Sequence, residues 1–213
     1  MGVFHMKTII TIGRQFGSGG KEIGERLAAH FGIKCYDKEL LSLAAKESGI
    51  CEEMIAIHDE RPTNSFLYNL VMDTYSFGYN ASSFSDMPIS HKVFLAQFDT
   101  IKKIADEGSC VIVGRCADYA LKEYDNCIRI FIHAKEDAKI ERIMEKYDLS
   151  SQKAKDMMNK KDKQRQSYYN YYSSNKWGRS DTYDLSIDSS MLGIDETVEL
   201  LIQYIEKFDK KLL

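Results

Sequence analysis

Proline is scarce in this chain, with only two among 213 residues, and no run approaches the roughly 20 apolar residues that a membrane-spanning helix needs. The five cysteines have no C-x-x-C spacing and the five histidines have no H-E-x-x-H spacing, so we expect no protein metal site and no disulfide framework. The N-terminus lacks the basic region and apolar run of a secretory signal. These absences predict a compact, reduced, cytoplasmic protein built on long helices.

Neither charge sign dominates, because 29 Lys and Arg stand against 32 Asp and Glu for a net charge of -3. No general affinity for nucleic acid follows from this balance. Residues 153–179 differ, with eight basic side chains against Asp156 and Asp162, a local charge of +6. This segment is typical of a basic lid that closes over polyphosphate, and a solvated helix face would explain many of its lysines equally well.

Four tyrosines accompany the basic segment: Tyr168, Tyr169, Tyr171 and Tyr172. They could form stacking platforms for single-stranded nucleic acid, or pack as a hinge between the lid and the core. We favour the packed hinge, both for these tyrosines and for Trp177, because the rest of the chain is acidic.

Short apolar runs alternate along the chain with amphipathic stretches. Residues 7–12, 33–36, 110–113, 127–133 and 185–188 are predicted as buried strands, and the stretches between them carry apolar residues every three or four positions. This alternation predicts a three-layer α/β domain with a parallel sheet of about five strands and helices on both faces. We expect residues 1–213 to form one such domain.

The pattern is less regular between residues 52 and 90. A helical stretch is predicted around residues 66–77, followed by a serine-rich loop at 82–85 ahead of Pro88. We interpret 52–90 as a helical insertion with a mobile loop. We assign no function to residues 1–5, which precede a second methionine, Met6.

A glycine-rich loop, Gly17-Ser18-Gly19-Gly20-Lys21, lies between the first predicted strand and the first long helix. Backbone N–H groups at such a helix N-terminus can hold phosphates, so residues 17–22, Glu22 included, are candidate phosphate ligands. A turn without a ligand is the alternative. The segment departs from G-x-x-x-x-G-K-[ST], because Gln15 replaces the first glycine and Glu22 the hydroxyl residue.

Arg115 follows Gly114 directly after the predicted strand at 110–113, at the sheet edge where α/β proteins bind ligands. Its guanidinium can hold a phosphate with two hydrogen bonds, or it can pair with a carboxylate at a helix end. Asp37, after the second strand, can cap the next helix. Cys116 is most simply a buried thiol.

The segment Gly13-Arg14-Gln15-Phe16-Gly17-Ser18-Gly19-Gly20-Lys21-Glu22-Ile23 resembles the hallmark of the cytidylate kinase-like family, a divergent branch of the P-loop kinases. The resemblance continues through 35–40, 111–115, 176–178 and 183 onward, and so covers nearly the whole chain except 52–90. It implies a domain of the P-loop NTPase type with a helical lid at 150–176. Within that lid, Asp162-Lys163-Gln164-Arg165 resembles the family's Asp-x-x-Arg.

The resemblance implies ATP-dependent phosphoryl transfer to a nucleoside monophosphate, CMP or dCMP, with Mg²⁺ as cofactor. The residues it implies are Lys21, Arg115 and Arg165 for catalysis, Arg14, Asp37 and Arg115 for the acceptor, and Lys161, Asp162 and Arg165 for the lid. Gly20, Glu22, Val113 and Cys116 depart from cytidylate kinases. They keep open an alternative, a nucleotide-binding or regulatory protein with little turnover.

Overall fold

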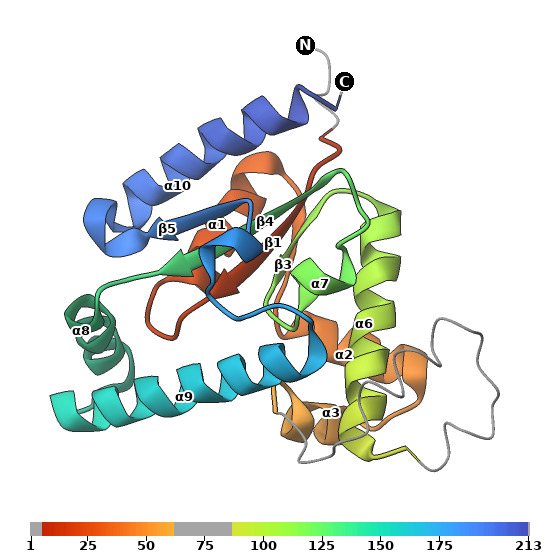
Figure 1. Cartoon of the computed structure of the whole chain (residues 1–213), viewed down its shortest axis with the longest axis horizontal. Helices are drawn as coiled ribbons and strands as arrows, with labels where there is room; N and C mark the ends of the chain where they lie inside the picture. The colour runs from red at the N-terminus through yellow and green to blue at the C-terminus, as the bar shows by residue number, and fades with distance from the viewer. Residues whose placement is uncertain (1–5, 62–86, 213) are drawn as a thin grey trace.

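Five parallel strands form the centre of the protein in the computed structural model, which describes residues 6–61 and 87–212 (Figure 1). In the order in which they lie side by side, they are β2 (Lys34–Tyr36), β3 (Cys110–Val113), β1 (Ile9–Arg14), β4 (Cys127–His133) and β5 (Leu185–Asp188). β1 is the middle strand, with Ile10 in register with Val111 on one side and Ile128 on the other. Apolar residues fill these inner strands because both faces of the sheet are covered.

Helices cover the two faces of the sheet. α1 (Gly20–Phe31) and α10 (Ser189–Asp209) pack on one face, and α6 (Ile89–Glu107) and α7 (Ala117–Ala120) pack on the other (Figure 1). α2 (Glu39–Ser48) and α3 (Glu52–His58) lie beside α6. α8 (Glu136–Tyr147) and α9 (Ser151–Tyr172) form a pair, and a short 3₁₀ turn (Ser180–Thr182) precedes β5.

The predicted architecture is confirmed: a five-stranded parallel sheet carries helices on both faces. Of the insertion at 52–90, the structure describes α3 and the start of α6, while the helical stretch predicted at 66–77 and the serine-rich loop at 82–85 lie outside the described residues. The segment predicted as a lid contains one 22-residue helix, α9. No helix in the described ranges has the length and apolar character to cross a membrane.

The tyrosines at the end of α9 belong to the core. Tyr168, Tyr169 and Tyr172 are buried, and the Tyr172 ring stacks on Phe94 of α6 with 4.1 Å between the ring centroids. The Trp177 ring makes a T-shaped contact with the Phe131 ring of β4. The predicted packing is therefore confirmed, because these rings lie against α6 and the start of α7 rather than facing solvent, while their role as a hinge stays a prediction.

All five strands end at the same edge of the sheet, and α9 runs across that edge (Figure 1). The residues just beyond the strands are the glycine loop after β1, Asp37 after β2 and Arg115 after β3. Parallel strands thus bring together segments that lie about 100 residues apart in the sequence. This edge is where the candidate site is found.

Candidate functional site

The glycine loop leads directly into the N-terminus of α1. Gly17 and Gly19 have φ values of +84° and +79°, in the left-handed region where a Cβ is unfavourable. Ser18 stabilises the loop from within, because its hydroxyl donates to the carbonyls of Gln15 at 2.9 Å and Ile132 at 3.1 Å. Within the described residues, the N–H groups of Gly17, Gly19, Gly20 and Lys21 have no acceptor. The loop is therefore preorganised to bind an anion.

Helix α9, in the segment predicted as a lid, touches the start of this loop. The Asp162 carboxylate accepts a hydrogen bond from the Phe16 N–H at 2.6 Å and lies 3.4 Å from the Lys139 ammonium. Lys139, on α8 and only 7% exposed, also donates to the Gln15 side chain at 3.1 Å. The structure thus places a buried cation at the phosphate loop that sequence reasoning missed. No local motif marks Lys139, and only the packing of α8 against the loop brings it there.

The two charged residues at the start of α1 point to different partners. The Lys21 ammonium lies 3.0 Å from Asp37 and 3.6 Å from Glu25, and the hydrogen bond to Asp37 raises the pKa of Lys21. The Glu22 carboxylate pairs instead with two arginines, Arg26 at 2.8 Å and Arg142 at 2.9 Å. Lys21 therefore links the glycine loop to Asp37 after β2, whereas the Glu22 side chain is engaged by arginines and leaves only its backbone N–H to the loop.

Three arginines from distant elements converge on the carboxylate of Glu60. Arg14, at the end of β1, donates to it at 2.6 Å, and Arg165 of α9 donates to its second oxygen at 3.3 Å. The backbone N–H of Arg115 lies 3.3 Å from the first oxygen. Although burial opposes ionisation, Arg14 and Arg165 hold the pKa of Glu60 well below its usual range. Glu60 is therefore a carboxylate at neutral pH.

The Arg115 side chain is buried, at 4% exposure, and is saturated by two other carboxylates. It donates to both oxygens of Asp59, at 2.9 and 2.8 Å, and to Asp37 at 3.2 Å. Burial favours the neutral guanidine, yet Asp59 and Glu60 raise the pKa of Arg115. Asp59 directly follows the last residue of α3, so the structure shows the ion pair with a helix-end carboxylate that the sequence left open.

These contacts determine where the predicted residues stand. The structure brings Arg14, Asp37, Arg115 and Arg165 into one cluster, hereafter the arginine cluster, together with Asp59 and Glu60. It does not bring Lys161 there, because Lys161 is exposed on α9. Sequence reasoning missed Asp59 and Glu60, which lie in the segment with no regular pattern. The Asp37 side chain does not cap α2, because it pairs with Lys21 and Arg115.

Behind the arginine cluster lies an acidic group in an apolar setting. Asp118 of α7 is buried and accepts a hydrogen bond from the Tyr169 hydroxyl. Burial raises the pKa of Asp118 to about 6, and the bond from Tyr169 opposes that rise. Burial also raises the pKa of the neighbouring Cys116 thiol, which is 3% exposed. Cys116 is therefore a buried, protonated thiol, as the sequence suggested.

In residues 6–61 and 87–212, no three His, Cys, Asp or Glu side chains gather where they could hold a metal ion. The carboxylates nearest the loop are already engaged, Glu22 by two arginines and Asp162 by Lys139 and a backbone N–H. A magnesium site made of protein carboxylates does not fit these residues.

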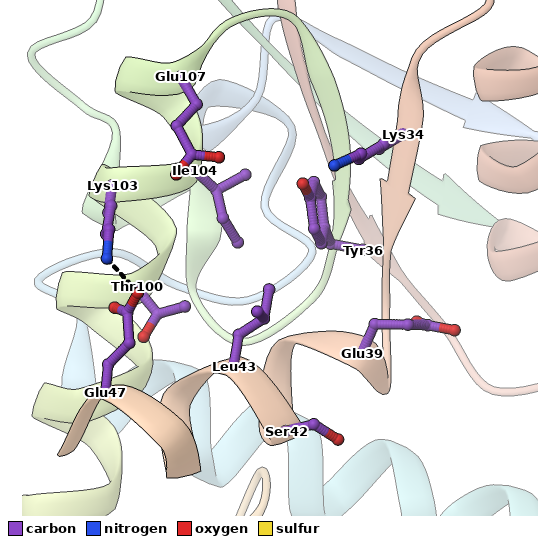
Figure 2. Close-up of a pocket in the computed structure, with 10 residues that line it drawn as sticks. All are labelled: Lys34, Tyr36, Glu39, Ser42, Leu43, Glu47, Thr100, Lys103, Ile104 and Glu107. Atoms are coloured by element: carbon purple, nitrogen blue, oxygen red, sulfur yellow. Dashed lines mark hydrogen bonds and ion pairs between the residues drawn. The ribbon is translucent and has the colours of Figure 1, made fainter. Parts of the chain in front are cut away.

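A groove of about 380 Å³ lies outside the arginine cluster, between α2, α6 and the edge strand β2 (Figure 2). Tyr36, Leu43 and Ile104 point into it, while Lys103 pairs with Glu47 at its rim (Figure 2). By contrast, the space beside Arg14, Arg115 and Arg165 amounts to only about 20 Å³. The charged cluster is thus filled by protein side chains, and the roomier groove carries neither the glycine loop nor the three arginines.

Residues 9–191 match the cytidylate kinase-like family. The crystal structure of an uncharacterized protein from Eubacterium ventriosum ATCC 27560 is 33% identical, with a TM-score of 0.71 over 94% of this chain and 99% of that one. No curated protein matches the chain.

Two further solved structures share the fold at low identity. A shikimate kinase from Bacteroides thetaiotaomicron is 10% identical, with a TM-score of 0.52 over 94% of this chain and 97% of that one. A gluconokinase from Sinorhizobium meliloti 1021 is 11% identical, with a TM-score of 0.50 over 98% and 97%. These likenesses confirm the predicted P-loop kinase fold. With a family match over most of its length, the chain belongs to the cytidylate kinase-like family.

Proposed function

We propose that the protein transfers a phosphoryl group from ATP to a nucleoside monophosphate, with CMP or dCMP as the acceptor. One observation carries this proposal: three arginines from β1, β3 and α9 converge beside a helix N-terminus whose N–H groups are open. One anion site is formed by backbone N–H groups and the other by guanidinium groups. Because the two sites are adjacent, they could hold the phosphates of a donor and an acceptor side by side.

On the donor side, the N–H groups of Gly17, Gly19, Gly20 and Lys21 would bind the ATP phosphates. The Lys21 ammonium is engaged by Asp37 and Glu25, so another cation has to balance the donor charge. Lys139 is the best placed, because its ammonium already lies against Gln15 of the loop. Mg²⁺ would arrive on the phosphates of ATP rather than on protein carboxylates.

On the acceptor side, Arg14 and Arg115 would hold the acceptor phosphate, and Arg165 would contact the phosphoryl group in transit. A phosphate monoester is already an anion at neutral pH, so its attacking oxygen needs no general base. The protein therefore has to align the two phosphates and neutralise their charge. Arg165 suits this role because α9 also carries Asp162, which touches the donor loop.

The test is a coupled assay of the purified protein with ATP, Mg²⁺ and each of CMP, dCMP, UMP, AMP and GMP. Arg115→Ala and Arg165→Ala should each lower kcat/KM by about 10² to 10³, about 2 to 4 kcal/mol of transition-state stabilisation. Arg179→Ala is the matched control, because Arg179 is exposed and pairs only with Asp181 among the described residues. Equal activity in all four proteins would refute the roles assigned to the two arginines.

A second candidate function is nucleotide binding without turnover. It is favoured by the engagement of Glu22 with Arg26 and Arg142, which leaves the loop without a metal-binding side chain after Lys21. ATP would then raise the melting temperature while no monophosphate is phosphorylated above background. Mg²⁺-dependent phosphoryl transfer to any of the five acceptors would exclude this alternative.

A further inference from the structure

The arginine cluster already holds an anion of the protein's own. One Glu60 oxygen accepts from Arg14 and from the Arg115 N–H, and the other lies 3.4 Å from a second Arg14 nitrogen and 3.3 Å from Arg165. A phosphate could take the place of this carboxylate, since carboxylate and phosphate oxygens accept the same hydrogen bonds from guanidinium groups. With only about 20 Å³ left beside it, the cluster cannot admit a phosphate while Glu60 stays.

Glu60 reaches this position from the periphery of the fold. It lies two residues beyond the end of α3, and its φ of +50° is unfavourable for a residue with a Cβ. Its two carboxylate oxygens are held by hydrogen bonds from Arg14, Arg115 and Arg165. A residue with unfavourable backbone geometry is therefore held at the cluster by hydrogen bonds to arginines, and a stronger anion can compete for those bonds.

We propose that Glu60 is a built-in competitor that occupies the acceptor phosphate site and must leave Arg14 and Arg165 before a phosphate monoester can bind. This rests on the proposed function only in naming the site as the acceptor's, because displacement by an anion requires no turnover. A phosphate group carries about -1.5 to -2 charges at neutral pH and three acceptor oxygens. It can therefore satisfy the arginines more fully than one carboxylate does.

The exchange would make the lid arginine available only when an acceptor is present. Arg165 lies on the helix whose Asp162 contacts the donor loop, and in this structure its guanidinium is engaged by Glu60 and by the Arg14 carbonyl at 3.3 Å. While Glu60 holds it, Arg165 is not free to contact a donor phosphate. An incoming acceptor phosphate replaces Glu60 and leaves Arg165 between the two substrates, which favours transfer over hydrolysis of ATP.

The test is Glu60→Gln, which keeps the side-chain size and removes the charge. Without ATP, calorimetry should show CMP binding at least about tenfold tighter than in the unchanged protein, since the fraction of binding-competent sites rises. Its melting temperature should be lower in anion-free buffer, because the guanidinium groups of Arg14 and Arg165 lose their counter-charge, and inorganic phosphate should restore it. Glu53→Gln, on the exposed face of α3, is the matched control and should change neither quantity.

Unchanged or weaker binding of both CMP and inorganic phosphate in Glu60→Gln would overturn the proposal and make Glu60 a permanent structural partner. If phosphate binds more tightly to that variant while CMP binds to neither protein, the competitor role stands and the choice of CMP fails. Glu60→Asp provides a second readout should the glutamine variant not fold. Its shortened carboxylate should still compete, but less well, giving an intermediate gain in phosphate affinity.

Discussion

The donor loop and the arginine cluster lie side by side, yet they are built in opposite ways. The loop comes from consecutive residues, uses backbone N–H groups and leaves several of them open. The cluster draws side chains from β1, β3, α9 and the chain after α3, and every arginine in it already has a carboxylate partner. An anion site made of backbone can thus stay open, because the N–H groups at a helix N-terminus carry only partial charge.

The arginine cluster, in contrast, carries full charges, which need counter-ions when they are buried. Three buried guanidinium groups without anions would have a prohibitive desolvation cost, so the fold supplies Asp37, Asp59 and Glu60. Under the proposed function, the glycine loop is ready for its ligand, while the arginine cluster has to exchange a partner. Three further experiments test this contrast.

The largest effect is expected from removing a cation of the cluster. Arg115→Met keeps much of the side-chain volume but leaves Asp59 and Asp37 buried without their guanidinium partner, and should lower the free energy of unfolding by about 3 to 5 kcal/mol. Urea denaturation provides the measurement. Arg179→Met, which breaks an exposed pair, should stay within about 0.5 kcal/mol. Similar losses in the two variants would contradict a charge-saturated cluster.

A pH-dependent effect is expected behind the cluster. Burial raises the pKa of Asp118 to about 6 from 3.8, so the folded protein binds a proton more tightly than the unfolded chain does. This contribution is present below about pH 4 and is lost as the pH rises through 6, a change of about 2 to 3 kcal/mol. Asp118→Asn should abolish it.

Unfolding free energies measured from pH 4 to pH 7 decide this prediction. Asp118→Asn should gain stability relative to the unchanged protein as the pH rises, whereas Asp125→Asn, at an exposed position, should follow the unchanged protein throughout. A constant difference across this range would show that Asp118 titrates normally.

The smallest effect is expected in the donor loop. In Gly17→Ala the new Cβ would lie 2.8 Å from the Lys139 carbonyl oxygen at a φ of +84°, so the loop has to shift. We expect a loss of about 1 to 2 kcal/mol in stability and about tenfold in ATP affinity, with CMP binding unchanged. Melting curves and calorimetry with each nucleotide measure both.

Gly32→Ala supplies the matched control at the other end of α1. Its φ is +65°, but nothing lies within 4 Å of the added Cβ. It should show a similar loss of stability and keep its affinity for ATP. If both variants lose ATP affinity equally, the Gly17 effect reports general destabilisation of α1 rather than a change in the phosphate loop.

The sequence by itself determined the sheet, the glycine loop and the place of Arg14 and Arg115 at the ends of strands, while only the family resemblance pointed to Arg165. These features depend on neighbours along the chain: β-branched runs form strands, glycines permit positive φ, and residues after parallel strands lie at one edge. Only the tertiary structure decided that Glu60 occupies the arginines and that Lys139 reaches the loop. Both contacts join residues separated by 46 to 124 positions, and the driving force is the need to neutralise buried charge, which leaves no periodic mark in a sequence.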